Sequence, residues 1–294
     1  MVRVLVVGGC GYIGSRLIPH LRAAGHEVMV TDLEMFGNGG VKAYRPQFHD
    51  FRGKDAVIWL ASISNNAMNE TSPWLTAVIN RDTVECAAMN ALDSGVKHFI
   101  YASSVAVYGN VEDATEESAL EPTTPYGMDK RWCERMLRGQ HDDLGATIVR
   151  AASVYGYSPN MRFDTPVNSM ARAAITGEKI TVNGGKQKRC HIHIDDLCYF
   201  YQILLSAPHL ARGEAFNAVG ICQPVMQTAR RVAAVLGGEI LEMPASDTRS
   251  YTALGHKAKT MLDFHATRSI EIGVQEIKNS WTPRKISNAD VRIL

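Results

Sequence analysis

Short apolar runs alternate with amphipathic stretches through the first half of the chain. Runs of four or five consecutive apolar residues are typical of strands buried on both faces of a parallel sheet. Apolar residues that repeat every three or four positions predict helices covering such a sheet. The first run is followed by a glycine turn and then by the helical spacing of Ile13, Leu17, Ile18 and Leu21. The predicted strands span residues 4–7, 27–31, 56–60, 98–102 and 147–150.

Helix signals stand between the later strands. Thr71 or Ser72 can cap a long helix, Pro73 suits its first turn, and Gly95 can end it. Another helix begins near Pro125. The alternation of strand and helix predicts an α/β fold with a doubly wound parallel sheet of the Rossmann type.

The rhythm becomes irregular beyond Ser153. Helical spacing returns near residues 167–175 and at 223–237, where two glycines end the second helix. We therefore expect a Rossmann domain over residues 1–152, which also receives strands or helices from about 186–220, and a smaller C-terminal substrate-binding lobe over residues 153–294.

Composition narrows the class of protein. Hydrophobic residues make up 46% and charged residues 21% of the 294 residues, as in ordinary globular chains. The formal net charge of +1 gives no reason to expect nucleic acid or an anionic membrane as a partner. No apolar run is long enough to cross a bilayer, and the first one ends in glycines instead of a signal-peptide cleavage site.

The cysteines favour a reducing compartment. They show no C-x-x-C spacing, and several stand in apolar stretches where a reduced thiol packs as a small hydrophobic side chain. We therefore expect reduced cysteines in a cytoplasmic protein. The six are Cys10, Cys86, Cys133, Cys190, Cys198 and Cys222.

A glycine-rich turn connects the first strand to its helix. Residues 8–14 read Gly-Gly-Cys-Gly-Tyr-Ile-Gly, and glycines let the backbone turn tightly and approach a pyrophosphate at a helix N-terminus. Asp32 follows the second strand, where a carboxylate accepts hydrogen bonds from an adenosine ribose and repels a 2′-phosphate. The pattern predicts a dinucleotide site that prefers NAD. Arg16 is the one nearby cation that argues for NADP.

Tyr126 and Lys130 stand four residues apart near the start of a predicted helix, so their side chains share one face. A lysine ammonium beside a tyrosine stabilises the phenolate and lowers its pKa. Tyr126 is then a usable general base. Ser104, at the carboxyl end of a central strand, can orient a substrate hydroxyl.

Four ordered motifs carry a family resemblance that spans nearly the whole chain. Together they resemble the extended short-chain dehydrogenase/reductase family, and within it the NAD-dependent nucleotide-sugar epimerase/dehydratase group. Residues 158–164 resemble a branch with sugar-nucleotide epimerases and a GDP-heptose C4 dehydrogenase. The four motifs are G-G-C-G-Y-I-G at 8–14, S-S-V-A-V-Y-G at 103–109, P-Y-G-M-D-K at 125–130 and H-I-H-I-D-D-L at 191–197.

The resemblance implies a set of roles. It makes Tyr126 the base, Lys130 its partner and a ribose ligand, and Ser104 the residue that positions the substrate hydroxyl. A nucleotide-diphosphate sugar is the implied substrate. The implied cofactor ligands are Gly8, Gly11, Tyr12, Ile13 and Gly14 for the pyrophosphate, Asp32 for the adenosine ribose, Asp50 and Phe51 for the adenine, and Leu60, Ala61 and Asn80 for the rest of the dinucleotide. The implied ligands of the sugar nucleotide, besides Ser104, are Asn168, Arg189 and Arg249.

Departures from the family pattern reduce the number of reactions that the resemblance supports. Val105 and Ala106 stand where 4,6-dehydratases carry an Asp-Glu pair, which disfavours dehydration, and Val105 also replaces the cysteine of the enzymes that make GDP-fucose. Three further departures affect sugar specificity. Trp59 replaces a usual histidine, Ser153 replaces an asparagine, and Cys190 and His191 replace Asp-Phe.

Three functions follow. The first is an epimerase that works through a transient keto sugar after C4 oxidation, and the second is a C4 dehydrogenase that releases the keto sugar. The third is a non-catalytic NAD-binding protein on the same fold.

His191 and His193 alternate on a predicted strand without a third ligand at suitable spacing, so we expect no metal. Apolar residues on several sides of the helix that carries Lys130 predict packing against another helix and, by resemblance, a homodimer.

Overall fold

A computed structural model describes residues 1–32, 46–64, 72–139, 141–245 and 249–281. Its centre is a six-stranded sheet in the order β2-β1-β3-β4-β5-β9, in which every neighbouring pair is parallel. The strands are β1 (Arg3–Val7), β2 (Glu27–Thr31), β3 (Ala56–Trp59), β4 (His98–Ser104), β5 (Thr147–Ala151) and β9 (Ala215–Ala218). The predicted parallel sheet is confirmed, and each predicted strand lies within two residues of an observed one.

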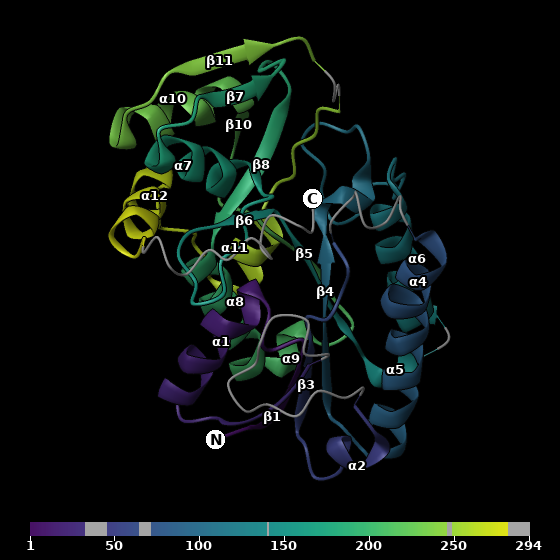
Figure 1. The fold of residues 1–294 in the computed structure, drawn as a ribbon. Coiled ribbons are helices and arrows are strands. Elements are labelled where there is room, and N and C mark those ends of the chain that lie inside the picture. The colour runs from purple at the N-terminus through teal and green to yellow at the C-terminus, as the bar shows by residue number, and fades with distance from the viewer. Residues whose placement is uncertain (33–45, 65–71, 140, 246–248, 282–294) are drawn as a thin grey trace.

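Helices cover both faces of this sheet, as a doubly wound fold requires. On one face lie α1 (Tyr12–Ala23) and α8 (Ile194–Ser206), and on the other lie α5 (Thr83–Asp93) and α6 (Pro125–Gly139) (Figure 1). Both layers bury apolar side chains against the strands. Short helices complete the described part of the sheet layer: α2 (Phe48–Phe51), α9 (Pro208–Ala211), α11 (His256–Leu262), and the 3₁₀ turns η2 (Val105–Tyr108) and η3 (Asp142–Leu144).

The predicted long helix is interrupted. It begins as α4 (Pro73–Ala77), continues as one π-helical stretch, η1 (Val78–Asp82), and ends as α5. Gly95, with φ of +72°, follows the last turn in the left-handed conformation that glycine adopts readily. π turns within helices are rare and are frequent at functional sites, and this one carries Asn80.

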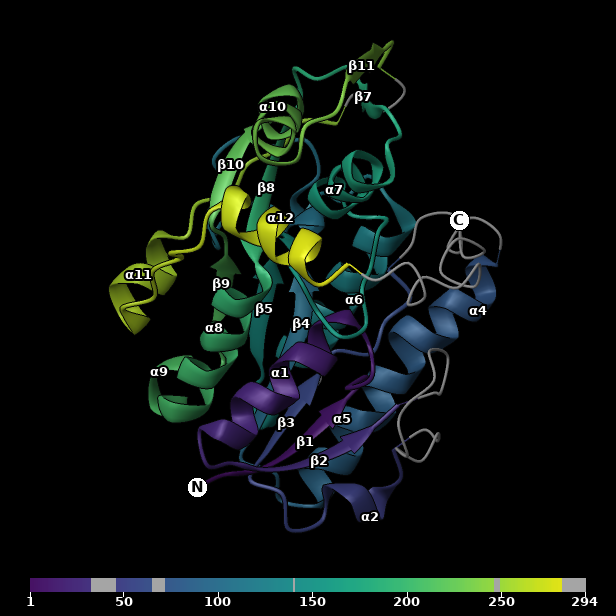
Figure 2. The same cartoon turned by 60° about the vertical axis from the view of Figure 1, so that its left-hand side comes forward.

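A second lobe lies beyond the carboxyl ends of the sheet strands (Figures 1 and 2). One sheet has the order β10-β8-β6 and another has the order β11-β7. Its helices α7, α10 and α12 share one apolar core. The elements are β6 (Ser153–Tyr155), α7 (Pro166–Thr176), β7 (Ile180–Asn183), β8 (Lys188–His193), β10 (Ile221–Pro224), α10 (Val225–Leu236), β11 (Ile240–Met243) and α12 (Ile270–Asn279).

The chain crosses between the two parts more than once. After β8, the chain returns to form α8, which packs on α1, and β9, which pairs with β5. This pairing supports a domain division near residue 152 with a return at about 186–220, which remains a prediction. The expected helix at 223–237 begins two residues late, because Gln223 belongs to β10 and pairs with Arg189. The predicted helix is confirmed, with its start displaced by two residues.

Pairing of β8 with β10 also corrects the expectation of six reduced cysteines. Cys190 and Cys222 stand opposite each other in the antiparallel ladder, and a disulfide joins them. The two residues are 32 positions apart, so spacing along the chain gave no indication of this contact. The other four cysteines, all within the described residues, take no part in a disulfide. Among the described helices, none combines the length and apolar character that a membrane crossing needs.

Candidate active site

The glycine turn lies at the carboxyl end of β1, between β2 and β3, where the strand order reverses. This switch point is the place where doubly wound sheets bind ligands. Gly8 has φ of +81°, and a Cβ there would lie 2.5 Å from the backbone nitrogen of Ala61. A Cβ on Gly14 would lie 2.5 Å from the Cα of Gly9. Both glycines are therefore required for the turn to pack between β3 and α1.

Helix α1 begins with an open N-terminus. Its N-cap residue Gly11 has no side chain to bond the first backbone amides, and no described side chain caps them. The amides of the first turn and the helix dipole favour an anion at this position. The predicted pyrophosphate ligands Gly8, Gly11, Tyr12, Ile13 and Gly14 all belong to this turn, and the cradle fits a dinucleotide.

Asp32 lies directly against the glycine turn. Its Oδ2 accepts a hydrogen bond from the backbone N–H of Cys10 at 2.8 Å. Arg16, the cation that argued for NADP, instead donates to Asp195 through Nε at 2.6 Å and Nη2 at 3.1 Å. Asp195 is buried, so this ion pair holds Arg16 between α1 and α8. The arrangement favours NAD over NADP.

The segments predicted to contact the adenine and the central part of the dinucleotide are well ordered by backbone bonds. The N–H groups of Leu60 and Ala61 both donate to the carbonyl of Val7, at 2.8 and 3.1 Å. Asp50 is buried and accepts from the backbone N–H of Gln47 at 2.7 Å. The Phe51 side chain lies in the core between the sheet and α5, so only its backbone is placed for a ligand contact.

Tyr126 and Lys130 lie one turn apart on α6, as predicted. The Lys130 Nζ is 5.6 Å from the ring centroid of Tyr126 and 4.7 Å from that of Tyr101. It also donates to the backbone carbonyl of Ala102 at 2.7 Å. Burial lowers the pKa of Lys130 to about 8, against opposing effects of neighbouring acidic groups. The ammonium is thus held against β4 and beside the tyrosine.

Ser104 ends β4 beside Tyr126. Its Oγ accepts from the backbone N–H of Ala106 at 3.2 Å, and the hydroxyl lies near enough to the Tyr126 phenol to affect its pKa. Burial raises the pKa of Tyr126, whereas the charge of Arg162 and the nearby Ser104 hydroxyl act to lower it. The structure therefore brings all three predicted catalytic side chains together.

Arg162 is a site residue to which the sequence assigned no role. Its Nη1 donates to the Ser64 Oγ at 2.5 Å, and its Nε and Nη2 donate to the Asp164 carboxylate at 2.5 and 2.8 Å. Ser64 follows β3, whereas Arg162 belongs to the second lobe. The only signal in the sequence was its place in the motif at residues 158–164. Arg162 places a cation near Tyr126 and Tyr12, because its charge affects the pKa of both phenols.

A buried ion pair supports the carboxyl ends of β4 and β5, where the predicted catalytic residue Ser104 lies. Glu134 on α6 and Arg150 on β5 are each 1% exposed, and their closest atoms are 2.7 Å apart. Ser103, next to Ser104, donates its hydroxyl to Glu134. Arg150 also donates to the Tyr108 hydroxyl at 2.8 Å. The pair therefore links α6 to the strand ends that hold Ser104.

Asn80 and Asn168 were predicted to contact ligands, and both are fully engaged within the protein. Asn80 accepts from the Ile63 N–H at 2.8 Å and donates to the Ile63 carbonyl at 3.0 Å. Asn168 accepts from the Gly156 N–H at 3.1 Å and donates to the Tyr12 hydroxyl at 3.1 Å. Both are buried, which favours a role in shaping the site. Their contacts with cofactor and substrate remain predictions.

The two predicted diphosphate ligands lie side by side. The Arg189 guanidinium donates to the carbonyls of Lys188 and Arg249, and it lies 4.8 Å from the ring centroid of Tyr251. A hydrogen bond thus joins Arg189 and Arg249, which are 60 positions apart in the sequence, near the start of β8. The structure places both arginines at the same end of the second lobe, and their role as ligands remains a prediction.

Residues 156–160 of the second lobe are tied to the glycine turn and to the helix that follows it. The Tyr12 hydroxyl donates to the carbonyl of Gly156 at 2.8 Å, and the Asn160 Nδ2 donates to the carbonyl of Cys10 at 2.6 Å. The hydroxyls of Ser15 and Ser158 are 2.8 Å apart. We call residues 156–160 the strap. The strap therefore lies against the glycine turn and the first turn of α1.

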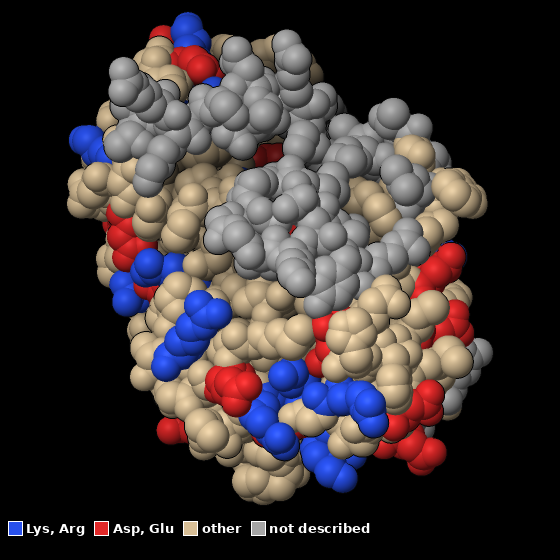
Figure 3. Space-filling model, turned by 60° about the horizontal axis from the view of Figure 1, so that its bottom comes forward, with Lys and Arg blue, Asp and Glu red and all other residues tan. Residues whose placement is uncertain are grey.

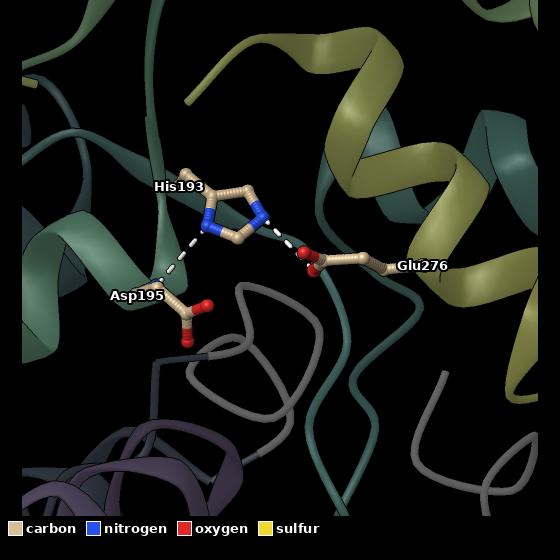
Figure 4. Close-up of side chains that lie close together, drawn as sticks. All are labelled: His193, Asp195 and Glu276. Atoms are coloured by element: carbon tan, nitrogen blue, oxygen red, sulfur yellow. Dashed lines mark hydrogen bonds and ion pairs between the residues drawn. The ribbon is translucent and has the colours of Figure 1, made fainter. Parts of the chain in front are cut away.

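His193, Asp195 and Glu276 form the one group of three possible metal ligands among the described residues, with ligand atoms within 4.8 Å of one another, and Figure 4 shows the His193 ring between the Asp195 backbone and the Glu276 carboxylate. The His193 Nδ1 accepts from the Asp195 N–H at 3.1 Å, and its Nε2 lies 3.2 Å from Glu276. Both ring nitrogens are thus engaged. Asp195 pairs with Arg16 and Glu276 with Arg268. The fold thus brings a third possible metal ligand, Glu276, to His193 and Asp195, which alternate along the chain. Because both carboxylates are paired with arginines, we interpret the group as an ion-pair network that joins α1, α8 and α12.

Charges on the visible surface are mixed in sign. On the face in Figure 3, lysine and arginine side chains lie beside aspartate and glutamate side chains. This face matches the near-neutral balance of 31 basic against 30 acidic residues in the chain.

Comparison with known proteins identifies the family. The model of the NAD dependent epimerase/dehydratase family matches residues 4–218, so the chain belongs to this family. The predicted membership is confirmed, and NAD is the cofactor of the family. The assignment agrees with the cradle at the end of β1.

The relatives include epimerases. A UDP-glucose 4-epimerase of Streptomyces lividans is 31% identical over 78% of this chain and 80% of its own length. A UDP-glucose 4-epimerase of Lactobacillus helveticus is 26% identical over 88% of this chain and 92% of its own. The solved structure of MoeE5 with UDP-glucuronic acid and NAD has a TM-score of 0.80 at 25% identity and covers 93% of this chain and 97% of its own.

Proposed function

We propose that this protein is an NAD-dependent nucleotide-sugar epimerase that oxidises a C4 hydroxyl to a transient ketone and then reduces it from the opposite face. The observation that carries the proposal is the meeting of Tyr126, Lys130 and Ser104 beside the glycine cradle. The family and the two epimerase relatives support the reaction class.

In this proposal, Ser104 orients the substrate hydroxyl and Tyr126 takes its proton at the phenolic oxygen. Burial alone raises the pKa of Tyr126, so the phenolate needs positive charge nearby. The Lys130 ammonium provides it from the same helix face, and Arg162 provides it from the second lobe. NAD, when bound, supplies the hydride acceptor for the oxidation and the donor for the return step.

The ligands would be held by groups whose geometry suits phosphates and ribose. The glycine turn offers backbone amides, and Asp32 stands beside it as the predicted ribose acceptor. Arg189 and Arg249 offer guanidinium groups, which form paired charge-assisted bonds with diphosphates. We propose that the cofactor lies along β1 to β4 and that the sugar nucleotide lies against the second lobe.

The strap favours an epimerase over a dehydrogenase. An epimerase regenerates its cofactor in every cycle and has no need to release it, whereas a dehydrogenase must exchange it. Three polar contacts tie the strap to the glycine turn and α1. Such a closed arrangement supports slow exchange of the dinucleotide.

We also keep the homodimer as a proposal. Met89 on α5 and Met128 on α6 are 52% and 43% exposed, and Trp74 on α4 is 76% exposed. These apolar side chains lie on the helices of one side of the sheet. Light scattering on the purified protein measures the mass directly, and a monomer at micromolar concentration would contradict the dimer.

A product assay separates the reactions. The protein with its bound NAD is incubated with UDP-, GDP- and dTDP-sugars, the sugars are separated by chromatography, and the bound dinucleotide is analysed for its oxidation state. We expect a C4 epimer and unchanged NAD. A keto sugar with one equivalent of NADH would identify a dehydrogenase instead, and no change with any sugar would favour a non-catalytic protein.

A further inference from the structure

Asp129 is a buried acid for which the proposed chemistry has no use. It precedes Lys130 on α6 and is 4% exposed. Its Oδ1 accepts from the Arg81 Nε at 2.6 Å, and its Oδ2 accepts from the Asn80 Nδ2 at 3.1 Å. A buried carboxylate needs such partners, because an unpaired charge away from water is costly.

Both partners of Asp129 come from the π-helical stretch η1. Asn80 and Arg81 are consecutive residues there, and together they engage both oxygens of one carboxylate. The Cys133 thiol, one turn further along α6, donates to the backbone carbonyl of Asn80 at 3.0 Å. The contact between α6 and η1 is therefore polar and specific in its geometry, and π turns often mark functional sites.

Asn80 also forms hydrogen bonds to the loop after β3. Besides its two bonds to Ile63, its Oδ1 accepts from the Ser62 hydroxyl at 3.0 Å. Ser64, which follows Ile63, accepts a hydrogen bond from Arg162. A continuous set of bonds thus runs from the first turns of α6, through η1, to the loop that follows Leu60 and Ala61.

We propose that Asp129 is a positioning residue whose carboxylate holds the turn carrying Tyr126 and Lys130 at a set distance from the loop after β3. This proposal rests on the function proposed above for Tyr126 and Lys130. Asp129 touches neither substrate nor cofactor in this account. It acts through Asn80 on one side and through the backbone of α6 on the other.

The charge of Asp129 has a second effect. Burial lowers the Lys130 pKa, and the carboxylate of Asp129 is one of the groups that raise it again, so Asp129 helps to keep the ammonium charged. Arg81 opposes this effect by pairing with the same carboxylate. The other groups around Lys130 are Tyr126, Cys133 and Glu134 on α6 and Tyr101 on β4.

Two substitutions should shift the Lys130 pKa in opposite directions. Asp129→Asn keeps the shape and removes the negative charge, so the Lys130 pKa should fall. Arg81→Gln leaves the carboxylate without its cation, so the pKa should rise. Glu271→Gln is the matched control, because it breaks another partly buried ion pair, with Arg231 at 2.6 Å, in the second lobe. It should leave the Lys130 pKa unchanged.

The pKa is measured by NMR on the full-length protein labelled with ¹³C at the lysine ε-carbon, with Lys130→Met to assign the signal. This measurement is independent of any catalysis. Opposite shifts support the proposal. Equal pKa values in Asp129→Asn and wild type, or shifts of the same sign in both variants, would overturn it. If Asp129→Asn fails to fold, the sign of the Arg81→Gln shift alone decides.

A kinetic comparison tests the positioning itself. Single-turnover hydride transfer should fall about tenfold in Asp129→Asn, while NAD affinity stays within about threefold. Asp129→Glu, which keeps the charge, should recover part of the rate. A rate equal to wild type would refute positioning. If wild type transfers no hydride from any sugar nucleotide while the NMR shifts appear as stated, the proposed function fails and the electrostatic role of Asp129 stands.

Discussion

The Lys130 side-chain nitrogen lies 5.6 Å from the centroid of the Tyr126 ring, one turn further along the same helix. A bond to the carbonyl of Ala102 fixes this nitrogen from the sheet side. Contacts within the protein therefore orient the ammonium. Its burial has an energetic cost, which shows in a pKa lowered to about 8.

This burial predicts a pH dependence of stability. The unfolded chain releases the Lys130 proton near the ordinary value of 10.5, whereas the folded protein releases it near 8. Between these values the unfolded state binds more protons, so the free energy of unfolding contributed by Lys130 rises with pH, by at most about 3 kcal/mol. Urea unfolding of the cofactor-free protein across this window measures the rise. Lys130→Met should lack it, and an equal rise in that variant would contradict the assignment.

Asp32 predicts the cofactor preference. The carboxylate beside the glycine turn should make NAD(H) bind at least about tenfold more tightly than NADP(H), or about 1.4 kcal/mol. Asp32→Asn should reduce this ratio, because it removes the charge that repels a 2′-phosphate. Calorimetry with both dinucleotides tests it. The control is Asp55→Asn, which changes an exposed ion pair with Arg3. Equal affinities in wild type would be incompatible with the prediction.

Arg249 and Arg189 predict where the sugar nucleotide binds. Replacing either with Ala should weaken sugar-nucleotide binding by about tenfold or more, since each removes a charge-assisted bond to the diphosphate. NAD binding should persist. Titration with a UDP-sugar in the presence of NAD gives both affinities. Arg172→Ala, on α7, removes an exposed ion pair with Glu178 and serves as control. Normal sugar-nucleotide binding in both site variants would show that the assignment is wrong.

The strap predicts slow release of the cofactor. Asn160→Ala removes the bond to the Cys10 carbonyl, and Ser158→Ala removes the contact with Ser15. The double variant should release NAD up to about thirtyfold faster, because each of the two lost hydrogen bonds contributes about 1 kcal/mol. Stopped-flow displacement measures the rate. Ser206→Ala, an exposed serine on α8, is the control. An unchanged release rate would remove this support for the epimerase.

The elements that the sequence predicted well are those set by local patterns. Both ends of the strand at residues 27–31 were predicted correctly, because the short apolar run there ends at a polar residue. The helix beginning at Pro125 followed from proline at the first turn. Gln223 was misplaced because its strand exists only through pairing with β8. Such pairing leaves no local signal.

The same limit applies to the site. The glycine turn and the spacing of Tyr126 and Lys130 are local, so their grouping could be predicted. Arg162, 36 residues beyond Tyr126, and the contact between Asp129 and Asn80, 49 residues apart, depend on how the lobes and helices pack. The fold thus brings Arg162 and the bond between Asp129 and Asn80 to the site, and the sequence motifs did not indicate either of them. The binding roles carried over by resemblance, such as that of Asn168, stay predictions.

The central claim is that the Tyr126 oxygen takes the hydroxyl proton during hydride transfer. Tyr126→Phe removes only this oxygen and keeps the ring that packs near Lys130. The fold and NAD affinity should persist, whereas the loss of a positioned base costs about 10²–10⁴ in rate. Tyr199→Phe, an exposed tyrosine on α8, is the matched control and should behave as wild type.

The most direct measurement is single-turnover formation of NADH absorbance after mixing the NAD-loaded protein with UDP-, GDP- and dTDP-sugars. Wild type and Tyr199→Phe should reduce bound NAD transiently with at least one sugar nucleotide, and Tyr126→Phe should do so at least about a hundredfold more slowly. Reduction in Tyr126→Phe as fast as in wild type would contradict the account.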